Sequence, residues 1–115
     1  MGRDDTVDVA RLADMLAAMG TEPRLRIMRL LLSAHPEGLV VSDVQQELAI
    51  PGPTLSHHLE KLRTNDLVLT RREGTFLRYM VNTASLRELL GFLYAECCGR
   101  NKPVSREELL QRCKC

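Results

Sequence analysis

The segment from Ser42 to Arg63 constrains the fold more than any other part of the chain. It predicts two short amphipathic helices with a break between them. Ser42 and Gln45 form a capping box, which predicts that the first helix begins at Asp43. The Pro-Gly-Pro sequence at 51–53 ends that helix because two of its residues lack an amide donor, and a proline is well suited to the first turn of the helix that follows.

The second of these helices has an apolar side and a polar side. Leu55, Leu59 and Leu62 recur at helical spacing and should face inward. The residues expected on the outer side and its flanks are Thr54, Ser56, His57 and Lys61. Such a helix suits the major groove of DNA. The alternative is a packed helix pair with a solvated outer face, in a protein that does not bind nucleic acid. The neighbouring His58 lies toward the inner edge and is expected to be packed and hydrogen-bonded.

After Arg63 the hydrophobic period changes from that of a helix to that of strands. Residues 67–81, LVLTRREGTFLRYMV, contain two β-rich runs joined through Glu73-Gly74, which predicts a hairpin. Arg71 and Arg72 should lie near its tip. An arginine-bearing hairpin after a helix-turn-helix is typical of a wing, although it could also be a solvated hairpin. The predicted fold class is therefore mainly α with a β-hairpin wing, a winged helix-turn-helix.

Two helices are predicted before this region. The first covers Val7 to Met19, with Val9, Leu12, Leu16 and Met19 on its inner face. The second runs from Glu22 to about Ser33, capped by Thr21, and is expected to be the central, most buried helix.

One long helix is predicted after the hairpin. It runs from Ser85, which forms a capping box with Glu88, to about Cys98. Its apolar stripe consists of Leu86, Leu89, Leu90, Leu93 and Cys97. A chain of 115 residues has little core left to bury this stripe, so a second subunit is expected to cover it. A two-fold homodimer would also present two recognition helices to successive major grooves, roughly 34–36 Å apart.

Composition limits the class of protein and its compartment. The net charge is +1, which argues against a sequence-blind polycation but leaves room for a local basic patch. We find no signal peptide and no apolar run as long as a membrane span, so a cytoplasmic protein with reduced thiols and no membrane partner is expected. Residues 1–98 are assigned to a winged-helix DNA-binding and dimerisation domain, and residues 99–115 to a cysteine-containing tail.

The order of these elements resembles the ArsR–SmtB family of metal-responsive winged-helix repressors. The resemblance rests on EPRLRIM, PTLSHHLEKLRTNDLV and RREGTFLRYMV and covers nearly all of 12–98. It implies a homodimer that binds operator DNA when empty and releases it on binding a metal or metalloid ion. It also implies that Thr54, Ser56 and His57 contact DNA, with Arg72 at a basic wing-tip position. Gly52 departs from the glutamine often found just before the recognition helix.

Several of the family's regulatory sites do not match this sequence. A Cys-Val-Cys arsenic site would need cysteines at Val40 and Ser42, the zinc sensors use histidines that do not occur after His58, and the cadmium and lead sensors need cysteines near the N-terminus. What remains is the pair Cys97-Cys98, which resembles the branch of arsenic sensors with a vicinal pair at the end of the last long helix.

The four cysteines are Cys97, Cys98, Cys113 and Cys115. Trivalent arsenic or antimony favours three thiolates, so the vicinal pair with either tail cysteine would complete a site, and this inducer is the one we expect. All four thiols would instead suit tetrahedral Zn(II), or a Zn/Cd-responsive repressor. Two thiols alone would suit an organoarsenical, and a disulfide between Cys97 and a tail cysteine would make a redox sensor. Cys97 could also be a small buried core residue. An enzyme is not expected, because no Cys-x-x-Cys or Gly-rich phosphate loop occurs.

Overall fold

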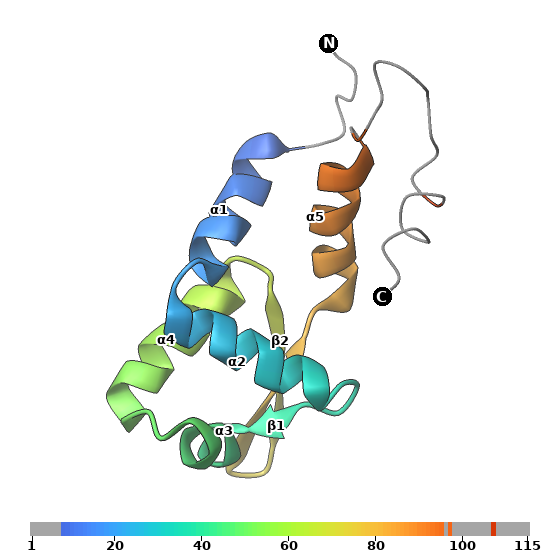
Figure 1. Ribbon diagram of the computed structural model, residues 1–115. Helices are drawn as coiled ribbons and strands as arrows, with labels where there is room; N and C mark the ends of the chain where they lie inside the picture. The colour runs from blue at the N-terminus through green and yellow to red at the C-terminus, as the bar shows by residue number, and fades with distance from the viewer. Residues whose placement is uncertain (1–7, 96, 98–106, 108–115) are drawn as a thin grey trace. The chain divides into compact units, whose positions relative to one another are not determined.

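The computed structural model describes residues 8–95, Cys97 and Glu107. The chain divides into two compact units, Met1–Asn82 and Thr83–Cys115. The first unit contains α1 (Val9–Met19), α2 (Glu22–Ser33), β1 (Leu39–Val40), α3 (Val41–Leu48), α4 (Gly52–Thr64), β2 (Val68–Glu73) and β3 (Phe76–Val81), and the second contains α5 (Thr83–Ala95) (Figure 1). This mainly helical order with a hairpin after α4 confirms the predicted fold class.

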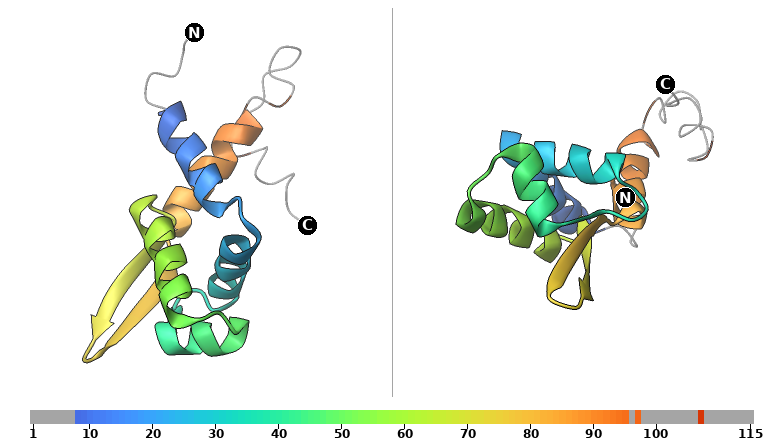
Figure 2. Two further views of the ribbon diagram at one scale, coloured as in Figure 1. Left: turned by 90° about the vertical axis from the view of Figure 1, so that its left-hand side faces the viewer. Right: turned by 90° about the horizontal axis from the view of Figure 1, so that it is seen from below.

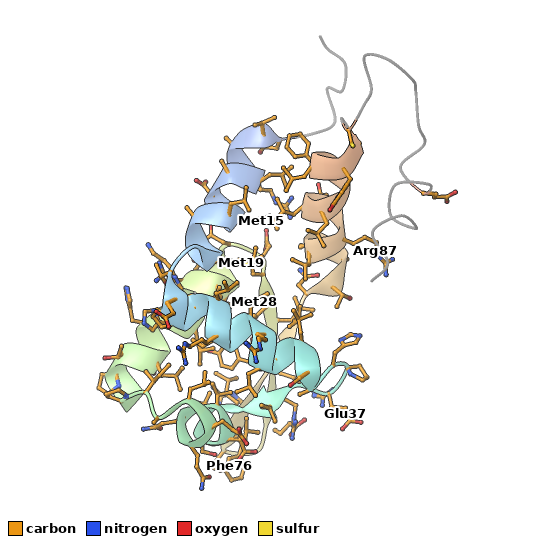
Figure 3. All side chains as sticks on the ribbon, viewed as in Figure 1. Met15, Met19, Met28, Glu37, Phe76 and Arg87 are labelled. Atoms are coloured by element: carbon orange, nitrogen blue, oxygen red, sulfur yellow. The ribbon has the colours of Figure 1, made fainter. Side chains whose placement is uncertain are left out.

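The core of the first unit is built mostly from aliphatic side chains. Figure 3 labels two of its members, Met15 of α1 and Met28 of α2. Its buried residues are Leu12, Met15, Ala18, Ile27, Met28, Leu31, Val44, Leu55, Leu59, Leu62, Leu67, Val68, Tyr79 and Val81. Each fully buried leucine or methionine contributes about 1.5–3 kcal/mol relative to an exposed one. Every helix of this unit supplies at least one of these residues, so the core fixes the position of α4 on α1 and α2.

The three strands form an antiparallel sheet in the order β1-β3-β2. The predicted hairpin forms, but its turn is Gly74-Thr75, one residue later than the predicted Glu73-Gly74, because Glu73 pairs with Phe76. Gly74 has a φ of +63°, a conformation that favours glycine. Gly38, before β1, has a φ of +71°, and an added Cβ would lie 2.0 Å from the carbonyl oxygen of Tyr79. Glycine is therefore required where this loop crosses β3. In both views of Figure 2 the hairpin extends away from α1 and α2.

The first helix differs from its prediction. It begins at Val9 rather than Val7, because the Asp8 carboxylate accepts a hydrogen bond from the amide of Arg11 at 3.1 Å and caps the helix. Its buried residues are Leu12, Met15 and Ala18, whereas Val9 is 58% exposed and Leu16 is 44% exposed. The helix is apolar around most of its circumference, so sequence periodicity did not identify which stripe would be buried.

Both predicted capping boxes are wrong. Helix α3 begins at Val41, and its N-cap is Val40, whose side chain makes no cap hydrogen bond. The reason is that Val40 pairs with Arg78 in the sheet, so the chain passes directly from strand to helix. Helix α5 begins at Thr83, which leaves Ser85 buried within the first turn instead of at the N-cap. By contrast, α2 begins where predicted, with the Thr21 hydroxyl accepting from the Arg24 amide at 3.4 Å.

Among the described residues, no helix combines the length and the apolar character that crossing a bilayer requires.

Candidate nucleic-acid interface

Helix α4 presents a polar surface that is anchored by leucines. Leu55, Leu59 and Leu62 are at most 1% exposed, as predicted. The four residues predicted to contact DNA from this helix, Thr54, Ser56, His57 and Lys61, are all exposed. Because the leucines hold the helix on the core, the positions of its outer side chains are fixed relative to the fold.

The start of α4 is open. Its N-cap is Pro51, whose side chain makes no cap hydrogen bond with the first amides of the helix. The preceding turn contains Ala49 in the left-handed conformation, with its amide bonded to the carbonyl of Gln45 at 2.8 Å. A Cβ added to Gly52 would meet only the Gln45 side chain, at 3.7 Å. Steric constraints therefore do not require glycine at position 52, where the ArsR–SmtB resemblance would lead us to expect glutamine.

Lys61 and His58 border α1 and α2 as well as the outer surface. Lys61 lines a cleft of 380 Å³ together with Asp14, Ala17, Ala18, Arg24 and Asn65. His58 Nδ1 lies 3.3 Å from the Arg24 guanidinium, whose Nε donates to the Ala18 carbonyl at 2.6 Å. Partial burial, followed by the charges of Arg24 and His57, lowers the pKa of His58. This confirms the prediction of a packed, hydrogen-bonded His58.

The two predicted wing arginines lie on opposite faces of the hairpin. Arg72 pairs with Leu77 and shares its face with the buried Val68, whereas Arg71 pairs with Arg78 on the other face. Arg72 is exposed and makes no hydrogen bond or ion pair within the part of the chain that the structure describes. Arg71 is exposed too, but its guanidinium binds the Glu73 carboxylate at 3.0 and 2.7 Å.

The sequence did not reveal the roles of Glu73 and Arg78. Arg78 donates to the Glu73 carboxylate at 3.0 Å and to the carbonyl oxygens of Glu37 and Gly38 at 3.4 and 3.2 Å. It thereby ties the hairpin to the loop before β1; Figure 3 labels Glu37 in that loop and Phe76 near the hairpin turn. The alternating pattern placed Arg78 on one face of the hairpin but did not identify a partner for it. The signal that could have identified this partner is Glu73, an acidic residue two positions after Arg71, which lies opposite Arg78.

Only one of the four predicted metal ligands can be located. Cys97 is exposed and lies in the turn after α5, with its amide bonded to the Tyr94 carbonyl at 2.9 Å. It is therefore not the small buried core residue that was considered as an alternative. Cys98, Cys113 and Cys115 lie outside the described residues. Within the described residues, no group of three or more His, Cys, Asp or Glu side chains is arranged to hold a metal ion.

Comparison with known proteins agrees with this geometry. A family model described as a helix-turn-helix domain matches residues 19–71. The transcriptional activator HlyU of Vibrio cholerae is 30% identical over 93 residues, covering 81% of this chain and 83% of HlyU. A solved structure of HlyU covers 80% of this chain and 98% of its own, at 33% identity and a TM-score of 0.61. An arsenical resistance operon repressor of Staphylococcus aureus is 33% identical over 79 residues, covering 69% and 73% of the two chains.

The solution structure of a homodimeric winged helix-turn-helix DNA-binding domain from Mycobacterium bovis is also similar, and that protein is described as a possible ArsR-family transcriptional regulator. It is 26% identical, covers 90% of this chain and 98% of its own, and has a TM-score of 0.62. The chain belongs to the ArsR family. The members that resemble this ArsR-family chain are transcriptional regulators rather than enzymes, and they include both an activator and a repressor.

Proposed function

We propose that this protein is a transcriptional repressor that binds operator DNA as a homodimer and releases it when trivalent arsenic or antimony binds its cysteine thiolates. The observation that carries the DNA-binding part is α4, a leucine-anchored helix that exposes a hydroxyl, imidazole and ammonium face and is followed by the wing. Residues 1–98 supply DNA binding and dimerisation, and the tail at 99–115 carries thiols. In this proposal Thr54, Ser56, His57 and Lys61 enter the major groove, while Arg71 and Arg72 contact the phosphate backbone beside it.

Exposed apolar side chains support a homodimer. Leu90, Leu93 and Tyr94 of α5 are 44%, 48% and 42% exposed, and Val9 and Leu16 of α1 are exposed to a similar degree. Exposed apolar residues on α1 and on α5 would be buried by a subunit interface. The M. bovis relative is a homodimer. A two-fold dimer would present α4 from each subunit to the same side of a duplex.

The choice of inducer rests on thiol chemistry. Thiolates are soft ligands that favour soft ions, and Cys97 is exposed at the end of α5. The S. aureus relative is named for arsenical resistance. We propose Cys97 and Cys98 as two ligands of the ion, with Cys113 or Cys115 as the third. An ion that binds the DNA-free conformation ten times more tightly would weaken DNA binding tenfold, which corresponds to about 1.4 kcal/mol of coupling.

An arsenite titration tests the inducer. A duplex is first selected by the reduced protein from a random library, and release of this duplex is then followed by fluorescence anisotropy as arsenite is added. The wild type should release the duplex, whereas Cys97→Ser and Cys98→Ser should retain it. Cys113→Ser and Cys115→Ser identify the third ligand, because only the variant that lacks it should need more arsenite. Equal release by the wild type and Cys98→Ser would contradict the proposed site.

Oxidation is the second candidate trigger, and the exposure of Cys97 favours it. An accessible thiol can be oxidised and then condense with a tail cysteine to form a disulfide. In the same titration, hydrogen peroxide replaces arsenite. Release by peroxide but not by arsenite would replace the metalloid mechanism with a redox mechanism.

A further inference from the structure

Two arginines and one glutamate share the outer face of the wing. Arg71 and Arg78 are directly opposite each other in the β2–β3 register. Like charges in directly opposed positions destabilise a hairpin. Glu73 lies two residues beyond Arg71 on the same face, and its two carboxylate oxygens bind different arginines, Oε2 binding Arg71 and Oε1 binding Arg78. One carboxylate thus bridges two guanidinium groups and reduces the repulsion between them, although the cluster keeps a net positive charge.

The same carboxylate connects the wing to the rest of the first unit. Arg78 donates to Glu73 at 3.0 Å and also to the Gly38 carbonyl at 3.2 Å, so the glutamate holds the guanidinium in place over the loop. Gly38 itself is buried against β3 and tolerates no side chain. The hydrogen bonds from Arg71 and then Arg78 lower the pKa of Glu73, so its carboxylate remains charged at neutral pH.

We propose that Glu73 is a positioning residue of the wing that competes with DNA phosphate for Arg71 and holds Arg78 against the loop before β1. This inference rests on the proposed DNA-binding function. Arg72 can bind phosphate directly, because it has no partner within the described residues. Arg71 must first exchange the Glu73 carboxylate for a phosphate. Glu73 therefore limits the electrostatic, sequence-independent part of DNA binding.

The salt dependence of DNA binding tests the competition. The DNA-binding constant falls as salt concentration rises, and each phosphate contact adds about 0.9 to the magnitude of the slope in a double-logarithmic plot. The slope is measured on the selected duplex and on an unrelated duplex of the same length. Arg72→Gln should lower its magnitude by about 0.9 per subunit, or about 1.8 for the homodimer, and Arg71→Gln by less than half as much. Glu73→Gln should steepen the slope and raise affinity for the unrelated duplex several-fold.

A double variant separates competition from a general change in charge. In the Glu73→Gln background, Arg71→Gln should lower the slope by the full value of about 0.9 per subunit, because Arg71 is then free to bind phosphate. Glu22→Gln serves as the matched control, because it removes the same charge from another exposed ion pair, with Arg26 on α2. The competition is refuted if Arg71→Gln matches Arg72→Gln in the wild-type background, or if Glu73→Gln is no steeper than Glu22→Gln.

A measurement without DNA tests the positioning role alone. In NMR spectra of the full chain, the Nε–H groups of Arg71 and Arg78 should exchange with water more slowly than that of Arg72, and Glu73→Gln should remove this protection. Equal exchange for all three arginines in the wild type would overturn the positioning role. A wild type that binds no duplex would defeat both the proposed function and the competition, while slow exchange at Arg71 and Arg78 would still support the positioning.

Discussion

Helices α4 and α5 have the same length, 13 residues, and both carry leucines at helical spacing, but their apolar faces are covered to different degrees. In α4 the leucines Leu55, Leu59 and Leu62 are at most 1% exposed. In α5, Leu90 and Leu93 are 44% and 48% exposed. The apolar face of α4 is therefore completed within the chain, and its polar face is available to a ligand. The apolar face of α5 is partly exposed, and this is the face that we propose a second subunit covers.

The largest expected effect comes from the core face of α4. Leu59→Ala should destabilise the fold by about 2–5 kcal/mol, because it leaves a cavity in a fully buried site. This is a large part of the stability of a typical small domain, about 5–15 kcal/mol. Urea unfolding followed by circular dichroism measures the loss. A change below 1 kcal/mol would show that α4 is not held on the core by its leucines.

The next effect should appear in subunit association rather than in folding. Burying the exposed half of Leu93 is worth about 1 kcal/mol, and a two-fold dimer contains this side chain twice. Leu93→Ser should therefore raise the dimer dissociation constant about 30-fold. Analytical ultracentrifugation measures this constant, and Leu25→Ser, at a leucine of α2 that is 57% exposed, is the matched control. An equal change in both variants would remove the distinction between α5 and other exposed apolar positions.

The polar face of α4 should respond in the opposite way, losing DNA affinity without losing stability. His57→Ala removes one predicted base contact from each subunit, and each contact is worth about 1–3 kcal/mol or about 5- to 150-fold in affinity for the selected duplex. His35→Ala, at an exposed histidine in the loop after α2, is the control and should change neither property. Anisotropy titrations measure affinity, and thermal melting measures stability. Identical affinities for the two variants would argue against α4 as the recognition helix.

The smallest effect concerns His58 and pH. Its pKa in the folded chain is lowered by burial, by Arg24 and by His57, so folding favours the neutral imidazole. The stabilisation is complete above the ordinary histidine pKa of about 6.5 and is lost as the pH falls through the lowered pKa. The wild type should therefore lose more stability than His58→Gln between pH 7.5 and pH 5, as measured by urea unfolding. If the variant follows the same pH profile, the pKa of His58 is not lowered in the folded state.

Patterns of fixed spacing predicted the structure well where a single face or turn was at stake. The three leucines of α4, the hairpin and the Thr21 cap of α2 are confirmed. The predictions failed where contacts between residues far apart in the sequence determine the local structure. Whether Ser42 caps a helix depends on β1 pairing with β3, and whether Leu16 is buried depends on which stripe of α1 meets the core.

The sequence predicted the exposure of the candidate DNA-contact residues but not their pairings. All six predicted DNA-contact residues are exposed. The difference between Arg71 and Arg72 follows from strand register, which puts them on opposite faces, and from the carboxylate that binds only one of them. A carboxylate shared by two arginines depends on side-chain geometry across a hairpin, and no spacing rule along the chain describes it.

The central claim is that two copies of α4 read one duplex, and hydroxyl-radical footprinting on the selected duplex tests this most directly. The account predicts two protected segments related by two-fold symmetry, with centres about 10–10.5 base pairs apart or a multiple of this spacing. A single protected segment, or uniform weak protection along the duplex, would contradict it.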